Sequence, residues 1–475
     1  MTKEEILAIL GAKEANGATR VKSVDFRFTD LRGREGHLSV PAQAIDETFL
    51  VRGKSLDFSP IAGWQGSGMA RMALVPDPET AVFDPFFDEK TLFFRCDIVD
   101  PVSLQSHVRD PRSIARRAEQ YLIATGIADR ALFAPEHEFF IFDDVRWGDD
   151  RQGCFYQVDA REAHWNSAKV YEDGNMGHRS WPGGGYLSMP PNDALHDLRA
   201  AMCATLEEMG LSVESHHHEV ASAGQCKVGI SPARLLNKAD AVMTLKYAVA
   251  NVAHAYGKTV TFMPKPIVGE NGSGMPVHQM LEADGRNLFA GDGYAGLSDL
   301  GLYYIGGILR HAHALNAFCN ASTNSYKRLL PGVEIPTLLS YSNAKRAAAV
   351  GISGVSNAEE RSVEVRFPDA TANPYLAFSA LLMAGLDGIR QRIHPGEALD
   401  RDFYDLASEY HQEPATVCLS LEQALVSLDQ DRDFLKMGEV FNDDVIDAYI
   451  DLKMEDVTRL RMTTHPIEFD LYYSL

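Results

Sequence analysis

The spacing of apolar and polar residues divides the chain into two regions of different character. In residues 21–100 short runs alternate with period two, most clearly at 24–29, and a second apolar run covers 91–99. Alternation of this kind is typical of half-buried strands. The polar stretch at 30–36 separates two such runs and predicts a turn. This region is therefore predicted to be a small sheet domain with few helices.

From residue 110 onward the apolar period becomes that of helices. Asp110 and Pro111 form a capping residue followed by a first-turn proline, and Gly126 can end the helix they begin. Further helices are predicted at 192–210 and 237–257, and Ser420 with Gln423 forms a capping box for another. Helices and strands do not alternate strictly, so the expected fold class is α+β. We expect domains at residues 1–108 and 109–475.

Composition narrows the class of protein. The formal net charge is −21 and 45% of the residues are hydrophobic. A strongly acidic chain argues against nucleic acid as a partner, and no apolar run is long enough to cross a membrane. The N-terminus resembles a charged helix more than a secretion signal, which favours a cytoplasmic location. The six cysteines lack C-x-x-C spacing and are expected to be reduced thiols.

Carboxylates occur at period two in the apolar segment 131–142. Glu136 and Glu138 fall on one face of this predicted strand, and like charges so close require compensation. A divalent cation or an arginine could supply it, and an edge strand with two solvated glutamates is the alternative.

Two other predicted strands carry charged side chains on one face. In 213–220 His217 and Glu219 share a face, whereas three adjacent histidines on alternating faces cannot all bind one metal ion. In 362–368 Glu364 and Arg366 point away from the core together, which also fits an ordinary salt bridge.

Two loops have the composition of anion sites. The glycine-rich segment 270–275 allows close backbone approach to a ligand, although it could be a simple turn. The segment 324–332 carries adjacent cations before a turn, and its alternative is a solvated basic loop.

Together these segments identify the chain as similar to the bacterial type I glutamine synthetase family over nearly its whole length. The runs that carry the resemblance are Gly63-Trp64, Ala134-Pro135-Glu136-His137-Glu138-Phe139-Phe140, 216–225, Asn271-Gly272-Ser273-Gly274-Met275, 324–332, Glu364-Val365-Arg366-Phe367-Pro368-Asp369 and Ala372-Asn373-Pro374-Tyr375-Leu376. Matches this long and in this order are specific.

The resemblance implies a small N-terminal β-grasp-like domain and a large catalytic domain of curved antiparallel strands flanked by helices. It implies a homo-oligomer, a dodecamer of two stacked hexamers, with active sites between neighbouring subunits and a C-terminal segment at 469–473 that binds the opposite ring. It also implies the reaction of ATP, glutamate and ammonia through γ-glutamyl phosphate, assisted by two Mg²⁺ or Mn²⁺ ions.

Site residues carry over position by position. Glu138 and Glu219 match ligands of the first metal, and Glu136 and Glu364 match ligands of the second. The remaining matches are Asn271, Gly272, Arg328 and Arg366 for glutamate, Glu214 and His278 for the nucleotide, Arg346 for phosphate, Asp57 of a neighbouring subunit for ammonium, Glu334 for the flap that excludes water, and Tyr404 for a tyrosine that the family adenylylates.

Three positions depart from the family pattern in ways that bear on catalysis. Lys227 replaces the third ligand of the first metal, Pro276 replaces a histidine ligand of the second, and Gly351 replaces an arginine near the phosphate. Unit charges about 4 Å apart interact by about 4 kcal/mol at an effective dielectric of about 20, so Lys227 would strongly oppose a dication. We expect its ammonium to lie near Glu138 and Glu219 in place of the ion.

These departures leave three functional alternatives. The chain could perform the family reaction at reduced rate, act as a ligase for another amine or acid, or be a catalytically silent ring-former. A silent ring-former would modulate an active glutamine synthetase paralogue or bind a nitrogen regulator. The changes at Lys227 and Pro276 favour weak or absent glutamine formation. A further expectation is that Tyr404 is a poor adenylylation target, because residues 407 and 408 are not the prolines of the family.

Overall fold

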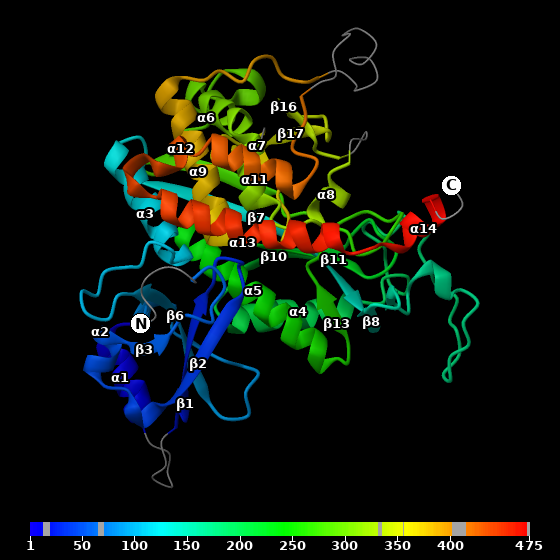
Figure 1. Cartoon of the computed structure of the whole chain (residues 1–475), viewed down its shortest axis with the longest axis horizontal. Helices are drawn as coiled ribbons and strands as arrows, with labels where there is room; N and C mark the ends of the chain where they lie inside the picture. The colour runs from blue at the N-terminus through cyan, green and yellow to red at the C-terminus, as the bar shows by residue number, and fades with distance from the viewer. Residues whose placement is uncertain (13–19, 65–70, 331–334, 355, 401–414, 473–475) are drawn as a thin grey trace.

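The structure is a computed structural model of the whole chain, and it describes all residues except 13–19, 65–70, 331–334, 355, 401–414 and 473–475. Two β-sheets organise it, a small one in the N-terminal region and a large one in the remainder (Figure 1). The small sheet lies at one end of the molecule, below the large sheet in the view of Figure 1. The α+β class and the two-part architecture are as predicted from the sequence.

The small sheet has strand order β2-β1-β6-β4-β3, with β5 paired to β6. Strands β1 and β6 run parallel, and the other pairs are antiparallel. Its elements are β1 (Ser23–Thr29), β2 (Glu35–Pro41), β3 (Lys54–Asp57), β4 (Arg71–Pro76), β5 (Val82–Phe83), β6 (Thr91–Val99), α1 (Lys3–Gly11) and α2 (Glu47–Arg52). Trp64 is buried in this domain against Phe58 and His107.

The large sheet has strand order β10-β11-β7-β14-β18-β17-β16. All of these neighbours are antiparallel except β16 and β17. Its strands are β7 (Arg130–Phe142), β10 (Val213–His218), β11 (Gln225–Ile230), β12 (Ala233–Arg234), β13 (Thr259–Thr261), β14 (Val277–Ala283), β15 (Arg286–Asn287), β16 (Leu338–Ser342), β17 (Ala348–Ser353) and β18 (Ser362–Val365). A separate hairpin joins β8 (Asp144–Asp149) and β9 (Cys154–Asp159).

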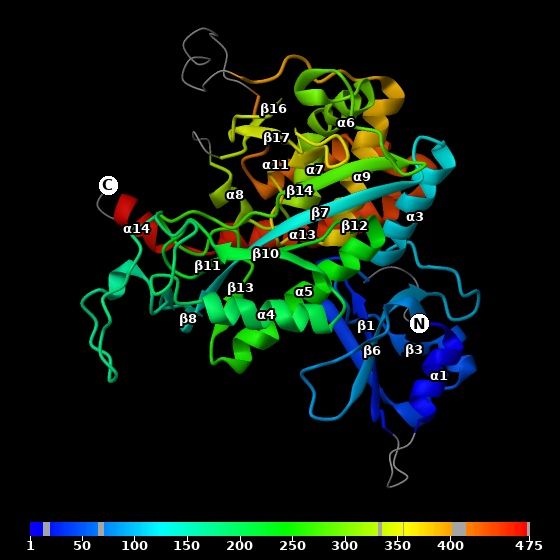
Figure 2. The ribbon, with the colours of Figure 1, turned by 180° about the vertical axis from the view of Figure 1, so that it is seen from behind.

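The long strand β7 runs through the middle of the molecule, as Figure 2 shows from behind. From Phe133 to Phe139 buried side chains alternate with half-buried ones, so one face meets the core and the other is partly open. This partly open face, with the charged side chains that the neighbouring strands β11, β14 and β18 place on it, is called the cleft below. Glu136 and Glu138 lie together on the cleft face, as their spacing predicts.

Helices cover the core face of the large sheet. The first of them confirms its predicted ends, since Asp110 caps α3, Pro111 begins it and Gly126 ends it in the left-handed conformation. The helices are α3 (Pro111–Thr125), α4 (His196–Glu208), α5 (Leu235–Ala255), α6 (Asp299–Arg310), α7 (Ala312–Cys319), α8 (Ser325–Arg328), α9 (Pro374–Gln391), α11 (Leu421–Gln430), α12 (Asp433–Lys436), α13 (Asp443–Met462) and α14 (Pro466–Tyr472).

Helix α9 is the centre of the largest hydrophobic core. It packs backbone to backbone against α6, because a Cβ added at Gly307 would lie 2.0 Å from the carbonyl oxygen of Ala384. Side chains at such positions would force the two helices apart. This close contact fixes the helical layer on which the strands of the site rest.

A buried arginine connects the small domain to the large one. Arg112, at the start of α3, donates to Asp97 and Asp77 of the small domain and to Asp240 of α5, over 2.6 to 3.0 Å. Three carboxylates around one guanidinium satisfy its donors and neutralise it in a buried place. This ionic contact therefore joins the two domains across their boundary.

The chain ends in an arm that leaves the body of the molecule. Helix α14 lies at its edge, at the right of Figure 1, and its Ile467 and Leu471 are exposed. Among the described residues no helix is long and apolar enough to span a membrane. All six cysteines are free thiols, and four of them are buried.

Candidate active site

The floor of the cleft is a row of charged side chains on three adjacent strands. In the register of β11 and β7, Lys227 lies directly opposite Glu138, and Gly229 lies opposite Glu136. On the other side of β11, Lys227 is the partner of His217 in β10. A cation thus stands in the middle of the carboxylates that the resemblance assigns to metals.

Lys227 forms its ion pair with Glu136. Glu136 is the diagonal neighbour of Lys227, and a lysine is long enough to reach it, while Gly229 has no side chain in the way. The sequence placed the ammonium near Glu138 and Glu219, and it did not predict the direct ion pair with Glu136. Glu138 and Glu219 remain near enough to raise the pKa of Lys227 against the lowering effect of its burial.

Glu136 has a second basic neighbour. His278, on β14, places its Nε2 3.4 Å from Oε1 of Glu136. Burial alone would raise the pKa of Glu136, but the contacts with His278 and Lys227 lower it to about 2. The carboxylate therefore stays ionised and is compensated on both oxygens by groups of the protein itself.

Glu138 and Glu219 form the less compensated part of the site. Glu138 accepts a hydrogen bond of 2.7 Å from the amide of Gly274. Glu219 is 3.7 Å from Nε2 of His217, as expected for two residues on one face. Burial and the nearby Glu138 raise the pKa of Glu219 to about 7.

Glu364 is also paired within the protein. On β18 it accepts a 2.9 Å hydrogen bond from Nε of Arg366, whose Nη1 donates to the carbonyl of Lys345. Both side chains point to the cleft, as predicted, and their pairing runs along the strand. Gly351 of β17 lies directly opposite Glu364.

The glycine-rich segment packs on Arg328. A Cβ at Gly274 would lie 2.6 Å from Nη2 of Arg328, and one at Gly272 would lie 2.3 Å from the carbonyl oxygen of Pro264. Arg328 donates to the carbonyls of Phe367 and Arg366, 3.0 and 3.2 Å away. Glycine is thus required here by crowding, which agrees with the interpretation of close backbone approach.

The remaining predicted residues are dispersed. Asn271 is exposed beside Gly272, Glu214 is exposed on β10, and Arg346 is exposed between β16 and β17. Asp57 ends β3 of the small sheet and accepts from the amide of Ser59 over 2.9 Å. Glu334 and Tyr404 lie outside the described residues, so their roles stay predictions.

Sequence reasoning missed two features of the cleft. Tyr186 packs nearly perpendicular to the ring of His217, the strand partner of Lys227, with centroids 5.5 Å apart. Glu162 accepts from the amide of Gly224 and contacts His218 at 3.0 Å, which shows that His218 is a structural histidine. The run of small residues before Tyr186 was the available signal for this loop.

These residues can bind two divalent cations only if enough of their oxygen and nitrogen atoms are not already paired within the protein. Glu136 is paired with Lys227, Glu364 is paired with Arg366, and Pro276 contributes only its carbonyl, which already accepts from the amide of Glu136. Within the described part of the chain no three acidic, imidazole or thiolate groups converge as a metal ion requires. The donor set does not fit the pair of ions that the family uses.

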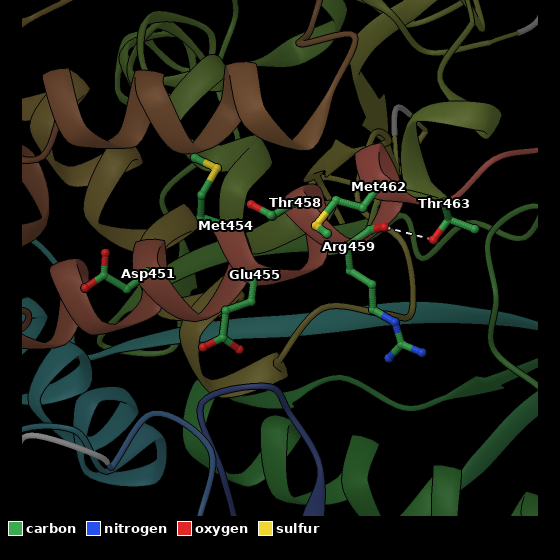
Figure 3. A pocket seen from close by; sticks show the side chains of 7 residues that line it. All are labelled: Asp451, Met454, Glu455, Thr458, Arg459, Met462 and Thr463. Carbon is green, nitrogen blue, oxygen red and sulfur yellow. Dashed lines mark hydrogen bonds between the residues drawn. The ribbon is translucent and has the colours of Figure 1, made fainter. Parts of the chain in front are cut away.

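A hollow of about 580 Å³ elsewhere on the surface lacks the character of a site. Its walls come from one stretch of chain, α13 and the residue after it, and Figure 3 shows the charged ends of Asp451, Glu455 and Arg459 well apart from one another. Polar groups that serve a ligand converge on it from several elements. This hollow is therefore not a candidate for the active site.

Comparison with known proteins gives the family. The glutamine synthetase β-grasp domain matches residues 20–101, and the glutamine synthetase catalytic domain matches residues 108–472. The chain belongs to the glutamine synthetase family, a family of ligases that implies ATP and divalent metal use.

Curated relatives with two different names match the chain over nearly its whole length. Glutamine synthetase of Methylococcus capsulatus is 61% identical over the full length of both chains, and that of Escherichia coli K12 is 54% identical over the same span. A protein of Cupriavidus pinatubonensis named 3-hydroxylaminophenol mutase is 56% identical over 96% of this chain and 97% of its own.

Solved structures agree on the fold. The Plasmodium falciparum glutamine synthetase has a TM-score of 0.89 at 27% identity, covering 100% of this chain and 99% of its own. A GmaS/ADP complex has a TM-score of 0.78 at 25% identity, covering 96% and 97%.

Proposed function

We propose that this chain is a carboxylate–amine ligase by class whose formation of glutamine from glutamate, ammonia and ATP is weak or absent. The observation that carries the proposal is the ion pair between Lys227 and Glu136. It puts a positive charge among the carboxylates where the family needs a dication. ATP and Mg²⁺ or Mn²⁺ remain the family's cofactors, and the proposal is that this cleft binds the metals poorly.

Electrostatics supports the proposal more than ligand counting alone. Lys227 is 19% exposed and Glu136 35% exposed, so solvent only partly screens the pair. Several oxygen or nitrogen donors are needed for a hard divalent ion, and a neutralised carboxylate is a poor one. With Pro276 as well, both ions lose a side-chain ligand.

The glutamate side of the cleft is better preserved. Arg328 is held against the glycine-rich segment, with Asn271 and Gly272 beside it. This supports retention of an amino acid site in a cleft that has lost its metal ligands. Asp57 of a neighbouring subunit would complete it, in a homo-oligomer of ring shape.

The experiment is a coupled assay of phosphate release with glutamate, a panel of amines and Mg-ATP or Mn-ATP. We expect little or no turnover with ammonia. Phosphate release with ammonia at a few turnovers per second or more, ordinary for enzymes, would overturn the proposal. Turnover with another amine would identify an altered ligase, and no turnover at all would support a silent ring-former.

A second candidate function comes from the Cupriavidus relative. A mutase rearranges one substrate and consumes neither ATP nor amine, so it does not need the donors that this cleft has lost. The relative's identity of 56% lies within the range of the glutamine synthetases. Incubation with 3-hydroxylaminophenol, without nucleotide, tests this candidate directly. Unchanged substrate would exclude it.

A further inference from the structure

The ion pair between Glu364 and Arg366 depends on the glycine at position 351. A Cβ added at Gly351 would lie 2.2 Å from Nη2 of Arg366 and 2.5 Å from Oε2 of Glu364. Both distances are far below van der Waals contact, and both atoms belong to the ion pair itself. No side chain at position 351 is compatible with Arg366 in its present place.

The register of the two strands explains the close approach. Gly351 and Glu364 are direct partners in the register of β17 and β18, so any side chain at 351 would project on the same face as Glu364. Arg366 lies two residues further along that face and folds back over the gap. Its guanidinium is held at the other end by the carbonyl of Lys345 at 2.9 Å.

We propose that Gly351 determines whether Glu364 is available to a divalent metal ion. Because position 351 carries no side chain, Arg366 pairs with Glu364 and acts as a second internal counter-ion in place of the metal ion. The proposal deepens the proposed function and rests on it for the meaning of the first counter-ion, Lys227. The two pairs occupy different strands, and each removes one carboxylate from metal binding.

The second pair also changes what Arg366 can do for a substrate. Its Nε and Nη1 are engaged by Glu364 and Lys345, so fewer donors point to a carboxylate in the cleft. A ligand would have to compete with Glu364 for the guanidinium. Displacing Arg366 from Glu364 is thus expected to strengthen metal binding and to free the guanidinium for an amino acid carboxylate.

The test measures Mn²⁺ binding by calorimetry, after the oligomeric state of each variant has been checked. The background is Lys227→Glu with Pro276→His, which returns both missing ligands. Adding Gly351→Ala is expected to tighten the second Mn²⁺ by about tenfold or more, since Glu364 is then released. Gly153→Ala is the matched control, because a Cβ there meets nothing within 4 Å.

A second variant covers the risk that Gly351→Ala does not fold. Arg366→Gln in the same background removes the guanidinium and leaves Gly351 in place, and it is expected to tighten the second ion likewise. Two equally tight ions in the background variant, with Gly351 intact, would overturn the inference. So would a second ion that stays weak in both added variants. Neither result touches the proposed function, which fails only if the unaltered chain makes glutamine.

Discussion

At the scale of single residues, Lys227 has the largest effect on the charge of the cleft. It faces Glu138 across the strands but bonds to the diagonal Glu136, because Gly229 leaves that direction open. Three carboxylates raise its pKa against burial, which keeps it a cation. The site therefore carries its own counter-charge.

Replacing that cation should restore metal binding. Lys227→Glu adds a ligand and frees Glu136, so we expect Mn²⁺ to bind at least about tenfold more tightly than to the parent. Calorimetric titration measures this, with Lys3→Glu on the exposed start of α1 as a control of equal charge change. Equal affinity in parent and Lys227→Glu would contradict the role given to Lys227.

Replacing Pro276 alone should achieve little. Pro276→His returns a ligand of the second ion, but Lys227 still neutralises Glu136, which belongs to the same ligand set. We expect Mn²⁺ binding close to that of the parent for this single change and a clear gain only in combination with Lys227→Glu. A double-mutant cycle measures the coupling, and additive effects would contradict it.

The sequence predicted which side chains share a face, but not how they pair. The positions of Glu136 with Glu138 and of Glu364 with Arg366 follow from period two alone. The choice of Glu136 over Glu138 by Lys227 depends on register, side-chain length and a glycine on the neighbouring strand. Those are properties of three strands at once, which a pattern along one strand cannot reveal.

At the scale of elements, local signals were the most dependable. Asp110, Pro111 and Gly126 set the ends of α3 as predicted, and Ser420 caps α11. Gln423 reaches the amide of Leu419, one residue before the cap, so the capping box is not the standard one. The order of strands in the large sheet, which joins residues far apart in sequence, had no local signal.

A histidine between helices should make stability depend on pH. His311, at the junction of α6 and α7, contacts Asp387 of α9 at 3.0 Å and Asp431 at the end of α11 at 2.7 Å. Burial alone would lower its pKa, but these two contacts raise it above the ordinary 6.5. A raised pKa in the folded state means that the stabilisation is complete below pH 6.5 and is lost as pH rises through the raised value.

The measurement is the apparent melting temperature between about pH 6 and pH 9, for the parent and His311→Gln. The variant is expected to melt lower at pH 6, and the difference should shrink toward pH 9. His254→Gln, at an exposed position near the end of α5, is the control. A difference that is constant across this range would show that His311 acts by packing on Phe434 alone.

At the scale of the whole molecule, the assembly remains a prediction. Trp64, which carries part of the family resemblance, is buried in the core of its own domain and is not exposed for a subunit interface. The arm at α14 does, because Ile467 and Leu471 are exposed on a segment that leaves the body of the chain. The domain boundary at residue 108 and the cytoplasmic location likewise stay predictions.

The ring can be tested by removing the arm. We expect the full chain to form a dodecamer at micromolar concentration and the chain without residues 466–475 to stop at a hexamer. Mass photometry distinguishes these states. A full-length chain that is a monomer or dimer would exclude the ring, and an unchanged dodecamer without the arm would show that the rings adhere by other surfaces.

The ion pair of Lys227 and Glu136 can be gained or lost by a small change in the gene. Every lysine codon becomes a glutamate codon by exchange of its first base alone, so the side chain that neutralises this cleft can be gained or lost in a single mutational step. The position is only half-buried and faces the cleft, so a change of charge there alters the cleft and not the hydrophobic core. The charge at this position can therefore be reversed by one base change.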